Sequence, residues 1–190
     1  FGALVSGYFG GTGGELLGRG YITPKYRSGA FEQAPVFWEV SIGAAEVEVD
    51  EATGRVQIIR YVSVADAGKA INPLQVESQD EGATMQAVGH TLFESMLYED
   101  GQLLNPNLVD YRIPTFDELP AVFDTIIIEH QDGPGPYGAK GIGEGGVVAV
   151  APAVGNALYN ATGIRIKELP LTPERVWRAL CAQSRSSESA

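Results

Sequence analysis

Residues 45–64, AEVEVDEATGRVQIIRYVSV, place apolar side chains mostly at alternate positions on both sides of a short polar turn. A period of two is typical of a β-strand with one buried face. Residues 50–54 (DEATG) have the composition of a hairpin turn, in which Gly54 takes a positive φ. The sequence therefore predicts two paired strands, over residues 36–50 and 55–64.

A helix is predicted to begin at Asn72-Pro73, because asparagine caps free backbone N–H groups and proline suits the first helical turn. Apolar residues then recur at spacings of three and four, which indicates one buried face. These residues are Met85, Val88, Leu92 and Met96. The helix is expected to continue almost to Asp100-Gly101.

The other elements are predicted from shorter patterns. Residues 102–122 are expected to be irregular, residues 124–130 to form a buried strand, and residues 147–160 to form a helix. A short strand is expected at residues 164–166, and Thr172-Pro173 begins a last amphipathic helix. Strands mixed with helices and a hairpin predict an α+β fold, with mixed sheets and packed helices.

Composition divides the chain into three parts. Residues 1–35 are rich in glycine and are expected to form an extended lead-in segment, residues 36–183 carry the periodic elements of one domain, and the serine-rich residues 184–190 are expected to be frayed. Because the first residue is Phe1 and not Met, the chain is expected to be a fragment, a processed product or a trimmed chain.

The overall composition excludes several classes of protein. With 44% hydrophobic and 19% charged residues among 190, the chain is globular and not disordered. Its net charge of −11 repels phosphate backbones, so no nucleic-acid partner is expected. The longest apolar run, residues 147–151, is too short to span a membrane. No signal segment opens the chain, so a cytoplasmic location is expected.

Metal-binding and redox side chains are scarce. The single cysteine, Cys181, excludes an internal disulfide and an iron–sulfur cluster held by this chain alone. The two histidines, His90 and His130, lie far apart in the sequence. No metal site made of this chain's own side chains is therefore expected.

Residues 138–146, GAKGIGEGG, surround Glu144 with glycines. Glycines allow sharp turns and close approach to a ligand, so this loop suits a carboxylate that acts as a base. A surface turn with a solvated glutamate fits the same residues. The stretch also matches the G-x-G-x-x-G pattern of dinucleotide sites, but an insertion separates the glycines from the preceding strand, and too little chain follows Glu168 for a doubly wound sheet.

One face of the helix that begins at Asn72 combines amides and glycines: Gln79, Gly82, Gln86 and Gly89. This face suits either a polar ligand or close packing across the glycines, with the glutamines in solvent. His90 is expected to be a polar surface or interface residue. Asp66, at the end of the second strand, is expected to have a structural role.

Several of these segments, in this order and spacing, resemble the xanthine dehydrogenase/aldehyde oxidase family, which includes carbon monoxide dehydrogenase and bacterial hydroxylases of N-heteroaromatic rings. The resemblance is to the C-terminal portion of the molybdopterin-binding subunit and covers about residues 36–180. It is carried by the segments 45–54 (AEVEVDEATG), 66–73 (DAGKAINP), 79–89 (QDEGATMQAVG), 104–114 (LNPNLVDYRIP) and 141–144 (GIGE).

The resemblance implies a molybdenum hydroxylase that oxidises an electron-poor carbon of an N-heteroaromatic, aldehyde or similar small substrate, with water as the source of oxygen. Glu144 matches the family's general base and Gln79 its cofactor-contacting glutamine, while Lys140 and Gly141 lie in the loop beside the cofactor. The cofactor is molybdopterin, in its simple form or as the cytosine dinucleotide. Two [2Fe–2S] clusters and FAD are expected on iron–sulfur and FAD subunits, with the remainder of the molybdopterin subunit as a further partner.

Some positions depart from the family pattern. Ala87 stands where glycine is expected, and His90 where glutamine is common. Glu144-Gly145-Gly146 lacks the prolines of the xanthine and aldehyde enzymes, which makes those two substrates less favoured. The alternative hypothesis is a non-catalytic interaction module that keeps the family's terminal domain.

Overall fold

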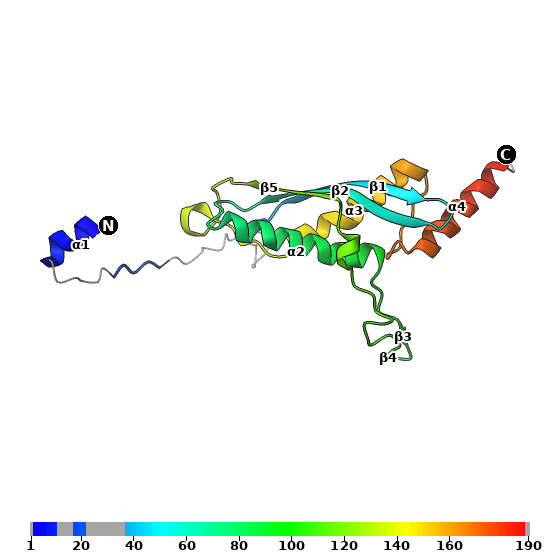
Figure 1. Cartoon of the computed structure of the whole chain (residues 1–190), viewed down its shortest axis with the longest axis horizontal. Coiled ribbons are helices and arrows are strands. Elements are labelled where there is room, and N and C mark those ends of the chain that lie inside the picture. The colour runs from blue at the N-terminus through cyan, green and yellow to red at the C-terminus, as the bar shows by residue number, and fades with distance from the viewer. Residues whose placement is uncertain (1, 11–16, 22–36, 189–190) are drawn as a thin grey trace, which may run out of the picture. The chain divides into compact units, whose positions relative to one another are not determined.

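The computed structural model describes residues 2–10, 17–21 and 37–188 and divides the chain into two units, residues 1–36 and 37–190 (Figure 1). In the first unit, Gly2–Phe9 forms the helix α1. The prediction of an extended segment is therefore wrong for these residues, whose Ala3 and Leu4 favour a helix. Residues 11–16 and 22–35 of that prediction lie outside the described residues.

The second unit contains a three-stranded sheet in the order β1-β2-β5 (Figure 1). Strands β1 (Ser41–Asp50) and β2 (Arg55–Asp66) form the predicted antiparallel hairpin, with Gly54 at a φ of 75° in the turn. Strand β5 (Val122–Ile128) pairs with β2 in parallel. The predicted strand near residue 124 is thus present, but the prediction that it is buried is wrong. It lies at the edge of the sheet, where Ile126 and Ile128 are about half exposed.

Helices α2 (Pro73–Leu92) and α3 (Gly145–Thr162) pack against each other and against the sheet (Figure 1). The core forms where alternate residues of β2 meet the apolar faces of these helices and of α4 (Pro173–Glu188). Its fully buried members include Ile58, Tyr61, Val88, Val150, Val154, Leu158 and Val176. This arrangement confirms the predicted α+β fold.

Helix α2 begins as predicted, with the Asn72 side chain accepting a hydrogen bond from the amide of Gln75. The predicted end near residue 100 is wrong, because α2 ends at Leu92 and Met96 is 59% exposed. The following residues form a small hairpin, β3 (Tyr98–Glu99) and β4 (Gln102–Leu103). The buried Asn105 side chain holds the base of this hairpin by bonding the backbone of Leu97 and Ser95, which competes with further helix.

Two short 3-10 helices, η2 (Phe116–Glu118) and η3 (Pro136–Gly138), interrupt the loops on either side of β5. The short strand predicted at residues 164–166 is wrong: the described chain is not paired there, and Ile164 is buried in the core instead. Helix α4 begins after Thr172 as predicted and continues to Glu188, into the segment expected to be frayed.

Candidate active site

The loop between β5 and α3 packs along the chain that follows β2. The amide of Lys140 donates to the carbonyl oxygen of Ala67 at 3.0 Å, and the amide of Lys69 donates to that of Gly138 at 3.2 Å. Gly68 has a φ of 59°, and a Cβ atom there would lie 2.2 Å from the Gly138 oxygen. Only glycine allows this approach, which fixes the first half of the loop.

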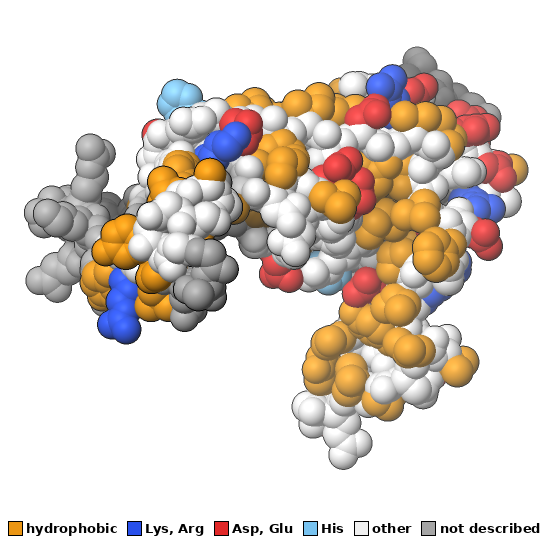
Figure 2. All heavy atoms as spheres, turned by 60° about the vertical axis from the view of Figure 1, so that its left-hand side comes forward, with side chains coloured by type: hydrophobic (Ala, Val, Ile, Leu, Met, Phe, Trp, Pro, Cys, Tyr) orange, Lys and Arg blue, Asp and Glu red, His pale blue; other side chains and the backbone are white. Residues whose placement is uncertain are grey.

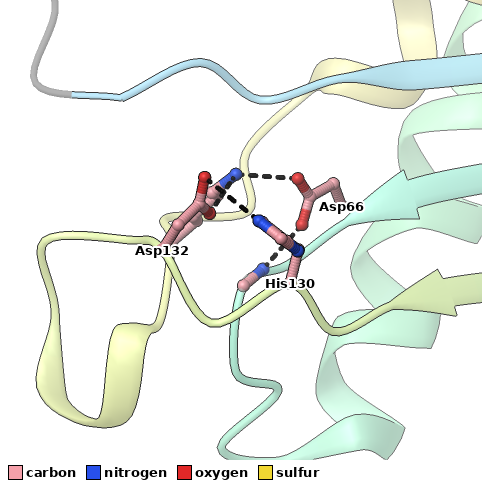
Figure 3. A network of polar contacts seen from close by, with 5 residues as sticks. Asp66, His130 and Asp132 are labelled. Carbon is pink, nitrogen blue, oxygen red and sulfur yellow. Dashed lines mark hydrogen bonds and ion pairs between the residues drawn. The ribbon is translucent and has the colours of Figure 1, made fainter.

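The side chain of Lys140 is almost fully buried, with 6% of it exposed, and its ammonium group binds the carboxylates of Asp66 and Asp132, which Figure 3 labels. Its Nζ lies 2.7 Å from Oδ2 of Asp66 and 2.8 Å from Oδ1 of Asp132. Oδ1 of Asp66 accepts a further hydrogen bond from the amide of Gly68, which confirms the structural role predicted for this aspartate. On the outer side, Nε2 of His130 lies 3.9 Å from Oδ2 of Asp132.

Hydrogen bonds to Asp132 and then Asp66 raise the pKa of Lys140. Burial alone would raise the pKa of Asp66, but the hydrogen bonds from Lys140 and Gly68 outweigh it and lower that pKa. Lys140 thus holds the loop between β5 and α3 in place through its two ion pairs. The contact between Lys140 and a cofactor stays a prediction.

Glu144 occupies the N-cap position of α3, and its side chain is exposed and makes no capping hydrogen bond. Side chains from distant segments hold the preceding residue, Gly143, through both its polar backbone groups. Nε2 of Gln79 donates to its carbonyl oxygen at 2.9 Å, and its amide donates to Oε2 of Glu39 at 3.4 Å. The carboxylate of Glu144 therefore extends from a short, anchored stretch of backbone.

Glu39 is a member of this site that the sequence reasoning missed. It precedes β1 and is 104 residues distant from Gly143 in the chain, and no local pattern marks it. A Cβ atom on Gly145 would lie 2.4 Å from Oε1 of Glu39. The glycines around Glu144 therefore give neighbouring side chains room to reach the loop backbone, a use that the glycine pattern alone does not reveal.

The face of α2 that combines amides and glycines serves more than one purpose. Gln79, Gly82 and Gln86 are exposed, and a Cβ atom on Gly82 would meet nothing within 4 Å. Gly89 is buried, and a Cβ atom there would lie 2.9 Å from Cδ of Pro114. Close packing is thus confirmed only at Gly89, and it involves a loop. His90 is half exposed, as predicted, with Nε2 3.6 Å from Oε2 of Glu94.

An open groove of about 580 Å³ lies between the first half of α2 and the loop. Its polar lining comes from Asn72, Gln75, Ser78 and Gln79 and its apolar lining includes Ile71 and Ile142. Amide side chains offer both donors and acceptors, as the polar edge of a pterin requires, and the N-terminus of α2 favours an anionic phosphate. The donors present therefore fit a molybdopterin.

Gly141 lies in the loop between Lys140 and Ile142, which both line this groove. It is exposed, and a Cβ atom there would lie 3.2 Å from Cζ of Phe37. Among the described residues, no three His, Cys, Asp or Glu side chains come together as a metal site. No helix in the described part of the chain is long and apolar enough to cross a membrane.

Comparison with known proteins identifies the family of this chain. The family model of the molybdopterin cofactor-binding domain matches residues 2–120. A probable hypoxanthine oxidase of Escherichia coli (strain K12) is 36% identical over 173 residues, which are 90% of this chain and 17% of that protein. One of the subunits of a nicotinate dehydrogenase from Pseudomonas putida is 36% identical over 93% of this chain and 14% of its own length.

The crystal structure of quinoline 2-oxidoreductase from Pseudomonas putida 86 has a TM-score of 0.63 and 35% identity, covering 71% of this chain and 18% of that one. The chain thus spans less than a fifth of these relatives. The fold, the groove and the matched domain lead to one conclusion. The chain belongs to the molybdopterin cofactor-binding domain family, in the xanthine dehydrogenase/aldehyde oxidase group of molybdenum oxidoreductases.

Proposed function

We propose that this chain forms part of the active site of a molybdenum hydroxylase, with Glu144 as the general base. The substrate is a small molecule with an electron-poor carbon, such as an N-heteroaromatic ring or an aldehyde, and water supplies the oxygen. The observation that carries the proposal is the exposed carboxylate of Glu144, on backbone that Gln79 and Glu39 anchor beside the groove.

Molybdopterin, when bound, supplies a molybdenum ion that takes up two electrons from the substrate. The residues of this chain then have separate tasks. Asn72, Gln75 and Gln79 present amides to the pterin in the groove. Gly141 lies in the loop beside it, and Lys140 holds that loop in place from within.

Glu144 accepts the proton that the attacking water must lose. A general base has to stand within hydrogen-bond reach of that proton, directly or through one water. The N-cap position leaves the carboxylate free to face a ligand, because it makes no hydrogen bond to its own helix. The anchored peptide of Gly143 limits how far the carboxylate can move, which favours a fixed geometry for proton transfer.

We further propose that the chain acts together with other parts of a larger assembly, which carry the rest of the molybdopterin site, the [2Fe–2S] clusters and FAD. Figure 2 shows hydrophobic side chains gathered on the segment that projects from the domain. This segment, which includes the hairpin of β3 and β4, contains exposed Met96, Leu97, Tyr98 and Leu104. Exposed apolar groups that gather in this way are typical of protein interfaces.

Metal and pterin analysis of the chain purified with its native partners tests this proposal. We expect about one molybdenum and one pterin for each copy of this chain. If the native assembly contains neither, the chain is a non-catalytic interaction module that keeps the family's fold, and the proposed function is wrong.

A further inference from the structure

A second acid, Asp80, lies on the inner side of α2, directly after Gln79. Only 2% of its surface is exposed, and its Oδ2 has no hydrogen-bond partner among the described residues. Burial raises the pKa of this carboxyl group. Because a buried and incompletely paired carboxyl group is costly, its place in the core indicates a specific use.

Asp80 lies against the first turn of α3. A Cβ atom on Gly146 would lie 2.8 Å from Oδ1 of Asp80 and 3.2 Å from Oγ1 of Thr84, so only glycine lets the two helices come this close. The first turn of a helix carries backbone N–H groups without intrahelical partners and the positive end of the helix dipole. The Asp80 carboxyl group lies beside this turn, where a negative charge is favourable for the helix dipole.

The polar surroundings of Asp80 extend to the sheet. Ser63 and Tyr61 of β2 are buried. The Ser63 hydroxyl lies near the Asp80 carboxyl group and partly offsets the rise of its pKa, while the hydroxyl groups of Tyr61 and Thr84 have no hydrogen-bond partner among the described residues. Burial, followed by the negative charge of Asp80, raises the pKa of Tyr61 to about 12. Buried polar side-chain atoms thus gather where α2, α3 and β2 meet, next to the first turn of α3.

Two consecutive residues of α2 thus lie against the chain on both sides of Glu144. Gln79 bonds Gly143, one residue before it, and the Asp80 carboxyl group lies close to Gly146, two residues after it, where a Cβ atom would meet it. We propose that Asp80 is a positioning residue, which fixes the first turn of α3 and thereby the direction of the Glu144 carboxylate. The inference rests on the proposed role of Glu144 as the base.

Amide hydrogen exchange on the full chain tests the positioning without any cofactor. Asp80→Ala should speed exchange at residues 143–148 by about five- to thirtyfold, the range expected when a partly buried charge at a helix terminus is lost. Asp80→Asn keeps the shape and an acceptor oxygen and should lie between Asp80→Ala and the wild type. Thr91→Val is the matched control, because Thr91 is a buried polar residue later on the same helix. Unchanged exchange at residues 143–148 in Asp80→Ala overturns the inference, whatever Glu144 does.

Kinetics of the assembled enzyme then test whether Asp80 affects catalysis by Glu144. Asp80→Ala should lower kcat by about tenfold or more, as a misplaced general base does, with KM and molybdenum content nearly unchanged, and Asp80→Asn should recover part of the loss. If Glu144→Gln is inactive while Asp80→Ala keeps its full kcat, the positioning role is wrong. If Glu144→Gln stays active, the proposed function fails, and the exchange measurement still decides whether Asp80 anchors α3. Should Asp80→Ala not fold, Asp80→Asn alone decides: exchange and kcat both equal to wild type would overturn the inference.

Discussion

The side-chain amide of Gln79 donates one hydrogen bond to the carbonyl oxygen of Gly143, directly before Glu144. A glutamine has a second N–H group and an oxygen with which to contact a ligand in the groove. The structure shows the bond to Gly143, and the contact with a cofactor that the resemblance implies stays a prediction. The position of Gln79 on α2 makes both uses compatible, because the helix forms one wall of the groove.

Gln79→Ala is expected to cost roughly 1–3 kcal/mol of cofactor binding, because polar groups of the ligand lose their partner. Molybdenum occupancy under limiting cofactor should fall, while the melting temperature stays close to the wild-type value. Gln86→Ala is the control, since Gln86 is exposed on the same helix and does not line the groove. Equal occupancy in Gln79→Ala and Gln86→Ala would remove Gln79 from the cofactor site.

Lys140 makes a pH-dependent contribution to stability. The pKa of Asp66 is lowered in the folded chain. The stability that Asp66 contributes is therefore present above the unfolded pKa of about 3.9 and is lost as pH falls through the folded value. The pKa of Lys140 is raised. The stability that Lys140 contributes is therefore present below the unfolded pKa of about 10.4 and is lost as pH rises through the folded value.

Lys140→Met should therefore lower the melting temperature at neutral pH, and the difference from wild type should shrink as pH falls below about 3.9 towards the lowered pKa of Asp66 in the folded chain. Lys167→Met is the control, because Lys167 is exposed. A melting temperature equal to that of wild type at pH 7 would show that the two ion pairs of Lys140 do not hold the loop.

At the scale of elements, the hairpin was the most predictable part. Alternating apolar residues and the turn ending at Gly54 depend only on near neighbours, and both were confirmed. The end of α2 was not predictable from spacing, because the apolar pattern runs on to Met96 while the Asn105 side chain fixes a hairpin in its place. The exposure of β5 was not predictable either, because an apolar run looks the same in a strand at the edge or at the centre of a sheet.

The candidate site was predictable only in part. Glu144 and Gln79 were predicted from the family resemblance and a glycine pattern, and the structure brings Gln79 to the residue before Glu144, while their roles stay predictions. Glu39 and the ion pairs of Lys140 join residues from 8 to 104 positions apart, and no local pattern encodes such pairs. The burial of Asp80 depends in the same way on how α3 packs on α2.

The turn of the β1–β2 hairpin also packs against the start of α4, and the energy of this contact can be measured by comparing two glycine substitutions. Gly54 and Gly101 both have a positive φ, 75° and 81°, but a Cβ atom on Gly54 would lie 2.1 Å from the carbonyl oxygen of Pro173, while one on Gly101 would meet nothing within 4 Å. Gly101→Ala should cost about 1–2 kcal/mol of unfolding free energy from backbone strain alone. Gly54→Ala should cost at least about 1 kcal/mol more, from overpacking against the start of α4. Equal losses in urea denaturation would mean that the turn does not pack on α4.

At the scale of the whole molecule, the chain combines a buried core with large exposed apolar side chains and an open groove. Its core explains how the site residues are held, and its surface explains why we propose that it works within an assembly. A net charge of −11 favours solubility of such a surface before assembly. The function proposed for the chain is therefore best measured in the assembled complex.

The turnover of that complex with Glu144→Gln is the decisive measurement for the proposed base. Glutamine keeps the size and hydrogen-bonding shape of glutamate but cannot accept the proton, so turnover should fall by about 10²–10⁴-fold. Molybdenum content and melting temperature should stay unchanged, because the exposed side chain supports little of the core. Glu48→Gln, on the exposed side of β1, should keep full activity. If Glu144→Gln retains activity within a factor of about three, or loses the cofactor or the fold, Glu144 is not the general base.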